Sequence, residues 1–405
     1  MPPPRTRREE RMPDVTATTC RIGLNYTPSR HWYYCWNDWD ARSIAADLGA
    51  IAELGADHIR LQLIWPYFQP NPTYVSEAHL DRLAELMDIA ENNGLDVLVA
   101  VLTGWLSGYF FLPSRTKRRD PFVRRDVIES EKQLFARVIE AVGDRPNFMG
   151  IDVGNEINCL DNSLPQELGD AWGREMAPYV RGLMSRGVLV NGIDHGPCVG
   201  GLVFSMEHLA GDYDAFCLHT WPKFTGALHR GPLDAPPSLN LAAFFTQLAK
   251  LFCPQGRPIW IQEFGACDTW GTPDQQAAFM TASIDRGVRA GASVFTWWCS
   301  HDKTRDLKFK EDEYQYGLLT PDNEPKPLAE TFRRLAGQYR GKPLSPEGGD
   351  VDVRIPVSRS FRPAYTQTVP KQEHALQQTH STTWQLYDRY LAAVADGKRP
   401  LLVWE

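Results

Sequence analysis

The sequence predicts an α/β fold, a (β/α)8 TIM barrel followed by a C-terminal appendage. Between residues 21 and 345, short apolar runs alternate with polar loops and amphipathic segments of helical length. The runs are nearly continuous in apolar residues, which is typical of parallel strands that are buried on both faces. There are eight of these runs, the number of strands that closes such a barrel.

Each predicted strand is a short apolar run bounded by polar or turn residues. In chain order the runs are RIGLNY at 21–26, HIRLQLIW at 58–65, LDVLVAVL at 95–102, FMGIDVG at 148–154, CVGGLVF at 198–204, AFCLHTW at 215–221, PIWIQEFG at 258–265 and SVFTWW at 293–298. A doubly wound open sheet is the alternative fold. Such a sheet usually has a Gly-rich phosphate turn after its first strand, and NYTPSRH at this place is not one.

The predicted helices between the runs carry apolar side chains on one face. They cover 77–92, 127–142, 242–252, 273–290 and 327–340. Gly94, Gly256 and Gly291 stand where helices are expected to end. The connection between the fifth and sixth strands is short and has room for one small helix at 206–213.

The two ends of the chain depart from this repeat. Residues 1–20 are rich in Pro and Arg and contain no apolar stretch of signal-peptide length, so we expect a disordered arm on a cytoplasmic protein. Residues 346–382 are polar, and a short helix at 383–395 and the apolar end LLVWE follow. We therefore expect a barrel over 21–345, with the C-terminal extension, 346–405, either packed on it or forming the start of a further domain.

The charge, cysteine and aromatic content of the chain exclude some classes of partner and favour others. Lys and Arg number 43 against 50 Asp and Glu, and the net charge of −7 is interspersed along the chain. This argues against nucleic acid or an anionic membrane as a partner, because both select a concentrated basic face. The eight Cys form no CxxC pair, so we expect buried, reduced thiols. The aromatic content of 11% suits a sugar-binding cleft, which uses flat rings near polar groups, although a bulky core also consumes them.

Two glutamates lie at the carboxyl ends of predicted strands, where barrel enzymes have their catalytic residues. Glu156 follows the fourth predicted strand, and Glu263 lies at the end of the seventh. We therefore expect them on opposite sides of the barrel mouth. Cleavage of a glycosidic bond needs such a pair, in which one protonated carboxyl donates to the leaving oxygen and one carboxylate attacks or supports the anomeric carbon.

Five motifs lie at or beside the ends of the predicted strands. They are HIRL with Arg60, GNE at 154–156, LHTW with His219, QEFG at 262–265 and WWCSHDK at 297–303. Together they resemble the clan A retaining glycoside hydrolases, and most closely glycoside hydrolase family five. The resemblance spans about residues 21–335.

The resemblance implies a role for each matching residue. Glu156 is implied as the acid/base and Glu263 as the nucleophile. Arg60 would orient the nucleophile, Asn155 would bind the sugar 2-hydroxyl, and His219 would belong to the same hydrogen-bonded group. We expect Arg60 to lower the pKa of Glu263, and a partly dry mouth and the charge of Glu263 to raise the pKa of Glu156.

Aromatic residues near the sixth and eighth strands complete the implied site. Trp298, with Trp297 as its rival, would form the floor of the subsite that holds the cleaved sugar. The family usually has His-x-Tyr on the sixth strand, and this chain has Trp221 in place of the tyrosine. Either an indole N–H replaces the tyrosine hydroxyl, or the nucleophile is held differently.

Three aromatic loops follow the first three predicted strands. They are HWYYCWNDWD at 31–40, LIWPYFQPNPTY at 63–74 and TGWLSGYFFLPSR at 103–115. Within them, Trp36, Asp38, Trp65 and Trp105 are the expected sugar contacts. The segments GLNYTPSRHWYYCWNDWD and WPYFQPNP resemble a bacterial branch of family five that includes intracellular exo-β-mannosidases, which act on short mannosides such as mannose-β-1,4-N-acetylglucosamine.

The leading hypothesis is a retaining β-glycosidase, exo-acting on β-mannosides of short oligosaccharides. Two alternatives stay open, an endo-β-glucanase or endo-β-mannanase with an open groove, and a barrel that binds glycans without cleaving them. The His residues have no metal-ligand spacing, so we expect no metal and no cofactor, and chelators should leave activity unchanged. The expected partner is the oligosaccharide substrate, and the sequence leaves a homo-oligomer open.

Overall fold

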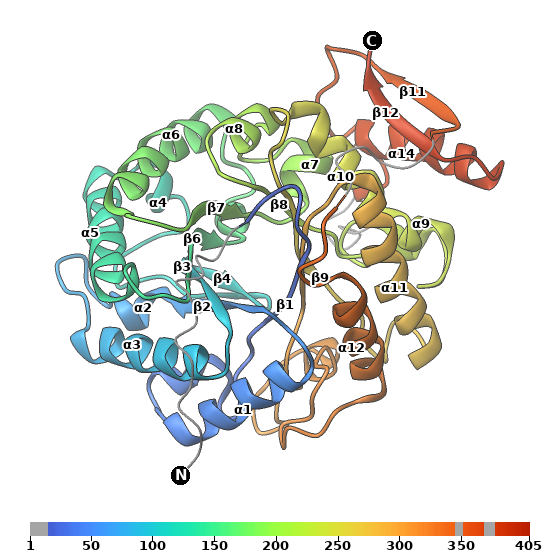
Figure 1. Ribbon diagram of the computed structural model, residues 1–405. Helices are drawn as coiled ribbons and strands as arrows, with labels where there is room; N and C mark the ends of the chain where they lie inside the picture. The colour runs from blue at the N-terminus through green and yellow to red at the C-terminus, as the bar shows by residue number, and fades with distance from the viewer. Residues whose placement is uncertain (1–14, 345–350, 368–376) are drawn as a thin grey trace.

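The computed structural model describes residues 15–344, 351–367 and 377–405, which form a barrel ringed by helices with an extension on one side (Figure 1). The eight barrel strands run parallel in the order β7-β6-β3-β2-β1-β10-β9-β8, and the two end strands of this order are in contact. The nearly closed barrel confirms the predicted (β/α)8 fold and excludes an open doubly wound sheet. The strands are β1 Arg21–Asn25, β2 His58–Ile64, β3 Asp96–Thr103, β6 Phe148–Asn155, β7 Val188–Gly192, β8 Phe216–His219, β9 Ile259–Phe264 and β10 Val294–Trp297.

Helices on the outside of the barrel cover the strands (Figure 1). They include α1 Ala41–Glu53, α3 Glu77–Asn92, α5 Arg125–Val142, α6 Gln166–Leu183, α8 Met206–Gly211, α10 Leu241–Phe252, α11 Pro273–Ala290 and α12 Pro327–Tyr339. Every predicted helical range between the strands coincides with one of them. Local chemistry sets their ends, since the Asp40 carboxylate accepts two backbone N–H groups at the start of α1, and Gly291 ends α11 with a φ of 102°.

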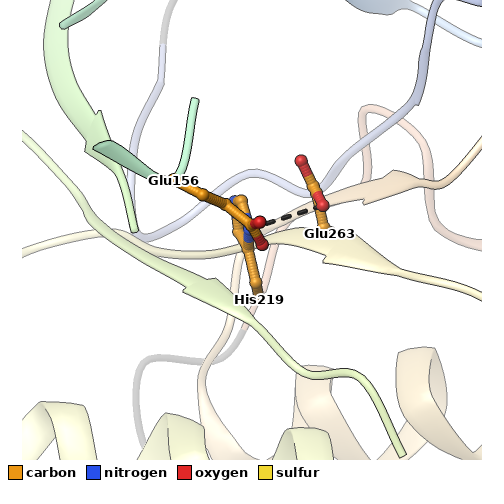
Figure 2. A group of neighbouring side chains, drawn as sticks. All are labelled: Glu156, His219 and Glu263. Atoms are coloured by element: carbon orange, nitrogen blue, oxygen red, sulfur yellow. Dashed lines mark hydrogen bonds and ion pairs between the residues drawn. The ribbon is translucent and has the colours of Figure 1, made fainter. Parts of the chain in front are cut away.

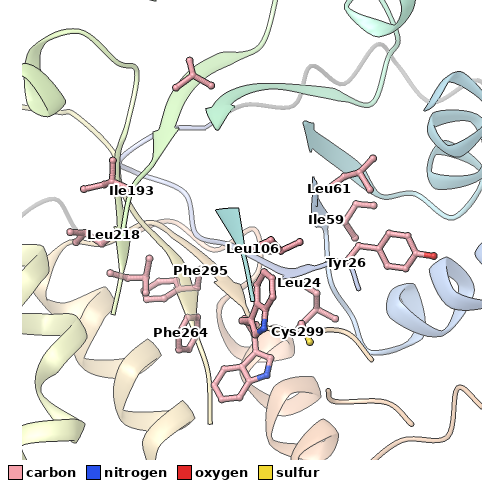
Figure 3. Close-up of a cluster of buried hydrophobic side chains, with 14 of the residues drawn as sticks. Leu24, Tyr26, Ile59, Leu61, Leu106, Ile193, Leu218, Phe264, Phe295 and Cys299 are labelled. Carbon is pink, nitrogen blue, oxygen red and sulfur yellow. The ribbon is translucent and has the colours of Figure 1, made fainter. Parts of the chain in front are cut away.

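The main apolar core lies between the strands and the helices (Figure 3). Leu24 of β1, Ile59 and Leu61 of β2, and Phe264 of β9 are all buried in it. All the residues of β2 are buried, which explains why the strands read as near-continuous apolar runs.

The fifth strand lies earlier in the chain than the sequence predicted. β7 is Val188–Gly192, whereas the predicted range, 198–204, overlaps the short helix α7 (Gly196–Gly200). Residues 198–204 do not have the extended backbone of a strand, because Gly201 and Val203 both have a φ of 65°. The residues between β7 and α7 therefore follow the carboxyl end of a strand and lie at the mouth of the barrel. The predicted range would have placed them before the amino end of a strand.

The N-terminal segment covers the amino ends of the strands. Val15 packs against an apolar cluster there, and the Cys20 N–H donates to the Lys342 carbonyl at 3.0 Å. Residues 15–20, predicted as the last part of a disordered arm, are therefore ordered on the barrel. The rest of that predicted arm, 1–14, lies outside the described residues.

The C-terminal extension contacts the barrel on the side of α7 and α10 (Figure 1). Its elements are β11 Val353–Val357, α14 Thr382–Ala395 and β12 Pro400–Trp404, and β11 pairs in parallel with β12. The indole N–H of Trp384 donates to the Thr225 carbonyl at 2.8 Å, which ties α14 to the loop after β8. The polar segment gave no signal for β11. Residues 345–350 and 368–376 lie outside the described residues.

All eight Cys are unpaired, and all except Cys253 are buried, as the sequence predicted. Burial raises the pKa of Cys20 and of Cys299 to about 12, so these thiols stay protonated. Among the described helices, none combines the length and the apolar character needed to cross a membrane.

Candidate active site

A cavity of about 1320 Å³ opens at the carboxyl ends of the barrel strands. Ordinary small-molecule pockets measure about 300–1,000 Å³, so this one has room for an oligosaccharide. The ends of β6 and β9 and the loops after β3, β7, β8 and β10 supply its walls. Among the residues that line it are Trp105, Glu156, Trp221, Glu263 and Trp298.

The backbone at Glu156 directs its carboxyl into this cavity. Glu156 follows β6 directly and has a left-handed conformation, with φ 44° and ψ 43°. Its N–H donates to the Gly192 carbonyl at 2.6 Å, which joins the end of β6 to the end of β7. A residue other than glycine adopts this conformation rarely and keeps it only where its surroundings hold it.

Glu156 and Glu263 share His219, at the end of β8, as a neighbour (Figure 2). His219 Nδ1 lies 2.8 Å from Glu156 Oε1 and 3.4 Å from Glu263 Oε2. One carboxyl oxygen of Glu156 and one of Glu263 lie within 4.8 Å of each other. Retaining glycosidases hold their two carboxyls about 5–5.5 Å apart, whereas inverting ones leave about 6.5–9.5 Å for a water. The separation in this cavity therefore matches the retaining geometry.

Arg60 and Trp221 hold Glu263 by both of its oxygens. The fully buried Arg60 donates from Nη1 to Glu263 Oε1 at 2.7 Å, and from Nε to Asp152 Oδ2 at 2.9 Å. Trp221 Nε1 donates to Glu263 Oε2 at 3.3 Å. An indole N–H thus contacts the nucleophile candidate at the place where the family pattern has a tyrosine hydroxyl.

Burial governs the protonation of the two carboxyls. It raises the pKa of Glu156 to about 8, with the charge of Asp194 as the second cause, and it raises the pKa of Glu263 to about 7. His219 and Arg60 oppose the rise at Glu263 without cancelling it. Arg60 therefore lowers the pKa of Glu263 as expected, but burial outweighs it and the net shift is upward. Because Glu156 has the higher pKa, a single proton on the pair resides on Glu156.

The hydrogen-bond network around His219 favours the same proton position. Burial lowers the pKa of His219, so the ring is neutral near pH 7. The Gln262 amide N–H donates to Asp152 at 3.1 Å, which leaves Gln262 Oε1, also at 3.1 Å from His219 Nε2, as an acceptor. His219 then carries its proton on Nε2 and accepts on Nδ1. The proton between His219 Nδ1 and Glu156 therefore belongs to Glu156.

Comparison with known proteins assigns the family. The family profile described as "Cellulase (glycosyl hydrolase family 5)" matches residues 15–304, more than half of the chain. The chain belongs to glycosyl hydrolase family 5. It is therefore a glycoside hydrolase, which removes the alternative of a barrel that only binds glycans.

Solved structures of family 5 proteins align with nearly the whole chain. A GH5_18 variant from Streptomyces cattleya in complex with Manβ1-4GlcNAc is 30% identical, with a TM-score of 0.85 over 95% of this chain and 94% of that chain. A GH5_18 protein from Bifidobacterium longum subsp. infantis is 26% identical, with a TM-score of 0.83 over 97% and 92%. The exo-β-1,4-mannosidase Op5Man5 from an Opitutaceae bacterium, 22% identical, shares the fold with a TM-score of 0.81 over 95% and 70%. No curated protein matches the chain.

In this family 5 enzyme, several predicted sugar contacts do line the cavity. Asn155 donates its amide N–H to the Trp105 carbonyl at 2.9 Å. Asn155 Oδ1 is buried and has no hydrogen-bond partner among the described residues, so it can accept a sugar hydroxyl. Trp298 lines the cavity, whereas Trp297 is buried and donates to the Tyr316 carbonyl at 3.4 Å. Of these two tryptophans, Trp298 is therefore the one that borders the cavity.

Three other predicted contacts lie outside the cavity, so these predictions are wrong. Trp36 and Trp65 are fully buried, and their indole N–H groups meet protein acceptors at 3.2 and 3.1 Å. Asp38 is exposed and pairs with His31 at 3.1 Å. The loops after β1 and β2 pack against one another and hold these tryptophans inside, as the edge-to-face contact of Trp36 with Phe68 shows, with 4.9 Å between the ring centroids.

Four acidic residues that line the cavity were not predicted, namely Asp161, Asp194, Asp312 and Glu313. Asp194 follows β7 and accepts the Gly196 N–H at 2.6 Å. Glu313 belongs to the loop after β10 and forms an ion pair with Lys303. Asp194 was missed because the predicted fifth strand began after it. Glu313 was missed because it stands in an irregular loop without periodicity.

The carboxyl pair and His219 are also the group, among the described residues, whose ligand atoms lie close enough together to hold a metal ion. Arg60, only 2.7 Å from Glu263, already supplies a buried positive charge there. A second cation would meet its repulsion in a medium of low dielectric constant. The arrangement is better suited to proton transfer and nucleophilic attack than to metal binding.

Proposed function

We propose that this family 5 enzyme is a retaining β-glycosidase that removes a terminal β-mannosyl unit from short oligosaccharides. The observation that carries the proposal is the close carboxyl pair, in which one oxygen of Glu156 lies within 4.8 Å of one oxygen of Glu263. The S. cattleya GH5_18 variant is in complex with Manβ1-4GlcNAc, which supports a short β-mannoside as the substrate.

The pair divides the chemistry into two displacements. Glu263 attacks the anomeric carbon while Glu156 gives its proton to the glycosidic oxygen, so the bond to the leaving sugar breaks and a glycosyl ester of Glu263 forms. Glu156 is then a carboxylate and takes a proton from water. That water attacks the same carbon, breaks the ester and releases the sugar with its original configuration.

The surrounding residues serve these two steps. Arg60 and Trp221 direct the oxygens of Glu263 and balance its charge before attack. His219 holds the proton on Glu156 until the leaving oxygen takes it. Asn155 Oδ1, buried without a partner, is available to the sugar 2-hydroxyl. Hydrogen bonds to this hydroxyl that strengthen in the transition state contribute several kcal/mol to glycosidase catalysis.

The outline of the cavity supports exo over endo action. None of the described residues in the loops after β1 and β2 lines it, so the mouth has a wall on that side. An endo-glucanase or endo-mannanase would need a groove that continues past the cleaved sugar in both directions.

The first test is hydrolysis of aryl β-mannoside, β-glucoside, β-galactoside and β-xyloside by the wild type. We expect cleavage of the mannoside at least tenfold faster than of the others. Preference for another sugar would overturn the assignment of mannose. Failure on all four, with cleavage of mannan or β-glucan, would favour the endo alternative.

The second test examines Glu263 directly. Glu263→Ala should lower activity by several powers of ten, and added azide should restore it with formation of the α-glycosyl azide. Glu330→Ala is the matched control, because this glutamate is exposed on α12. Full activity of Glu263→Ala would rule out its role as the nucleophile.

A further inference from the structure

Two segments far apart in the sequence meet at the mouth of the barrel. One is the hairpin after β3, formed by β4 (Trp105–Leu106) and β5 (Tyr109–Phe110), and the other is the loop 303–316 after β10. We call the two together the cross-mouth bridge. Tyr109 donates its hydroxyl to the Lys308 carbonyl at 2.7 Å.

A buried ion pair anchors the bridge beneath this contact. The side chain of Lys303 is fully buried, and its ammonium group pairs with Glu313 and donates to Ser107 Oγ at 3.2 Å. The same ammonium lies 4.7 Å from the ring centroid of Phe309 and 5.6 Å from that of Trp32. Cation–π contacts and the carboxylate together offset the cost of burying the charge. Loss of either partner would leave a buried charge, so the pair holds the loop in one position.

The bridge passes over the loops that follow β1 and β2. In the sheet, these two strands lie between β3 and β10, from which the two halves of the bridge arise. Trp32, from the loop after β1, packs beneath it with its ring 4.9 Å from that of Phe309. On the cavity side the bridge presents Ser107, Gly108 and Glu313. The aromatic loops of β1 and β2 are therefore behind a wall.

The position of the acid candidate shows which end of the substrate meets this wall. Glu156 must face the leaving sugar, and the cavity wall on its side of the barrel includes Asp161, after β6, and His195, after the neighbouring β7. That side therefore receives the leaving part of the substrate. The terminal sugar that is cleaved off points the other way, toward the bridge.

We propose that the cross-mouth bridge determines exo specificity by closing the cleft one sugar beyond the cleaved bond on the non-reducing side. This inference rests on the proposed function and extends it to a named structural element. A chain that carries one more sugar on its non-reducing end would collide with the bridge residues Ser107 and Gly108. Opening the bridge should let such a chain bind across the carboxyl pair.

The test uses p-nitrophenyl β-1,4-mannobioside and identifies the first sugar released. The wild type should release mannose from the far end before nitrophenol. The double variant Tyr109→Ala Phe309→Ala should release intact mannobiose together with nitrophenol, and raise the initial ratio of mannobiose to mannose at least tenfold. Tyr74→Ala is the matched control, since Tyr74 is an exposed tyrosine of the loop after β2, 52% exposed against 42% for Tyr109.

A second variant guards against misfolding. Ser107→Ala Tyr109→Phe removes both cross-mouth hydrogen bonds with little change in volume, and should shift the ratio in the same direction by a smaller factor. An unchanged ratio in folded variants would overturn the proposal, as would release of mannobiose by the wild type. Neither result contradicts β-mannosidase activity, which cleavage of the aryl mannoside tests separately. If the four aryl β-glycosides show a preference for another sugar, the p-nitrophenyl disaccharide of that sugar replaces the mannobioside. The ratio of disaccharide to monosaccharide released is then measured in the same way.

Discussion

The protonation of Glu156 depends on residues from three other strands of the barrel. Asp194 follows β7, His219 ends β8 and Glu263 lies on β9. Burial and the charge of Asp194 raise the pKa of Glu156, while the neutral His219 accepts a hydrogen bond from the protonated carboxyl. A general acid must be protonated at the working pH, and this arrangement favours the protonated state of Glu156.

The Asp194→Asn variant tests this electrostatic coupling. Removal of the negative charge lowers the pKa of Glu156, so the acid loses its proton at a lower pH. The alkaline limb of the kcat/KM profile should therefore move to lower pH, with a several-fold loss of activity near pH 8. Profiles measured on an aryl mannoside would show this, and Asp322→Asn, at an exposed aspartate, is the control. A limb that stays in place or moves to higher pH would contradict the coupling.

Arg60 has a structural role beside the catalytic one proposed for it. It is fully buried between Asp152 and Glu263, so its loss leaves two carboxylates without their cation. We expect Arg60→Met to lower the free energy of unfolding by about 3–5 kcal/mol. Urea unfolding at pH 7 checks this. A loss smaller than about 1 kcal/mol would mean that the carboxylates find other partners.

Single residues were predictable where a motif lies at the end of a strand. Glu156 and Glu263 follow from GNE and QEFG, because the end of a parallel strand in a barrel always reaches the mouth. The pKa of Glu263 was not predictable from Arg60 alone, because the burial that outweighs this cation is a property of the assembled site.

At the scale of elements, the loops decide which aromatic residues reach a sugar. Trp105, on the hairpin after β3, lines the cavity, whereas Trp36 and Trp65 are buried inside the loops that carry them. Sequence alone could not separate these cases, because each tryptophan stands in an aromatic loop after a barrel strand. The difference arises from tertiary packing, because the loop after β2 packs on Trp36, whereas the hairpin that carries Trp105 lines the cavity.

Tryptophan variants separate the two roles. Trp36→Ala should lower the free energy of unfolding by about 3–5 kcal/mol, as expected for a large buried side chain, and leave KM within about twofold of the wild type. Trp105→Ala should raise KM several-fold with a smaller loss of stability, because its side chain is partly exposed in the cavity. Urea unfolding and steady-state kinetics on the same preparations distinguish them. A large change of KM in Trp36→Ala alone would contradict the placement.

The fifth strand shows where periodicity fails. CVGGLVF has the apolar content of a strand, yet two adjacent glycines and the positive φ of Gly201 and Val203 place it in a helix and a turn. The real strand, VLVNG, is shorter and ends in polar residues. The five longer predicted helices were correct because their apolar spacing extends over about three or more turns.

At the scale of the whole molecule, the extension is part of the catalytic unit. α14 contacts α7, which follows β7, and Trp384 reaches the loop after β8. Gln377, just before α14, lines the cavity. The sequence predicted an extension on the barrel, but not that it borders the cavity. Contacts between residues far apart in the chain do not show in local residue patterns.

Trp384→Ala tests whether the extension stabilises the barrel. This side chain is 2% exposed, and its removal should lower the free energy of unfolding by about 3–5 kcal/mol. Trp404→Ala is the matched control, because that tryptophan lies in the same extension and is only partly buried, so its loss should cost less. Equal effects, or a separate unfolding transition for the extension, would contradict a single cooperative unit.

The most direct test of the central claim is the configuration of the first sugar released from Manβ1-4GlcNAc, followed by proton NMR from the first minute. A retaining exo-β-mannosidase that uses Glu156 and Glu263 must release β-mannose first, and α-mannose then appears only by slow mutarotation. Immediate formation of α-mannose would show inversion and contradict the assignment of Glu263 as the nucleophile.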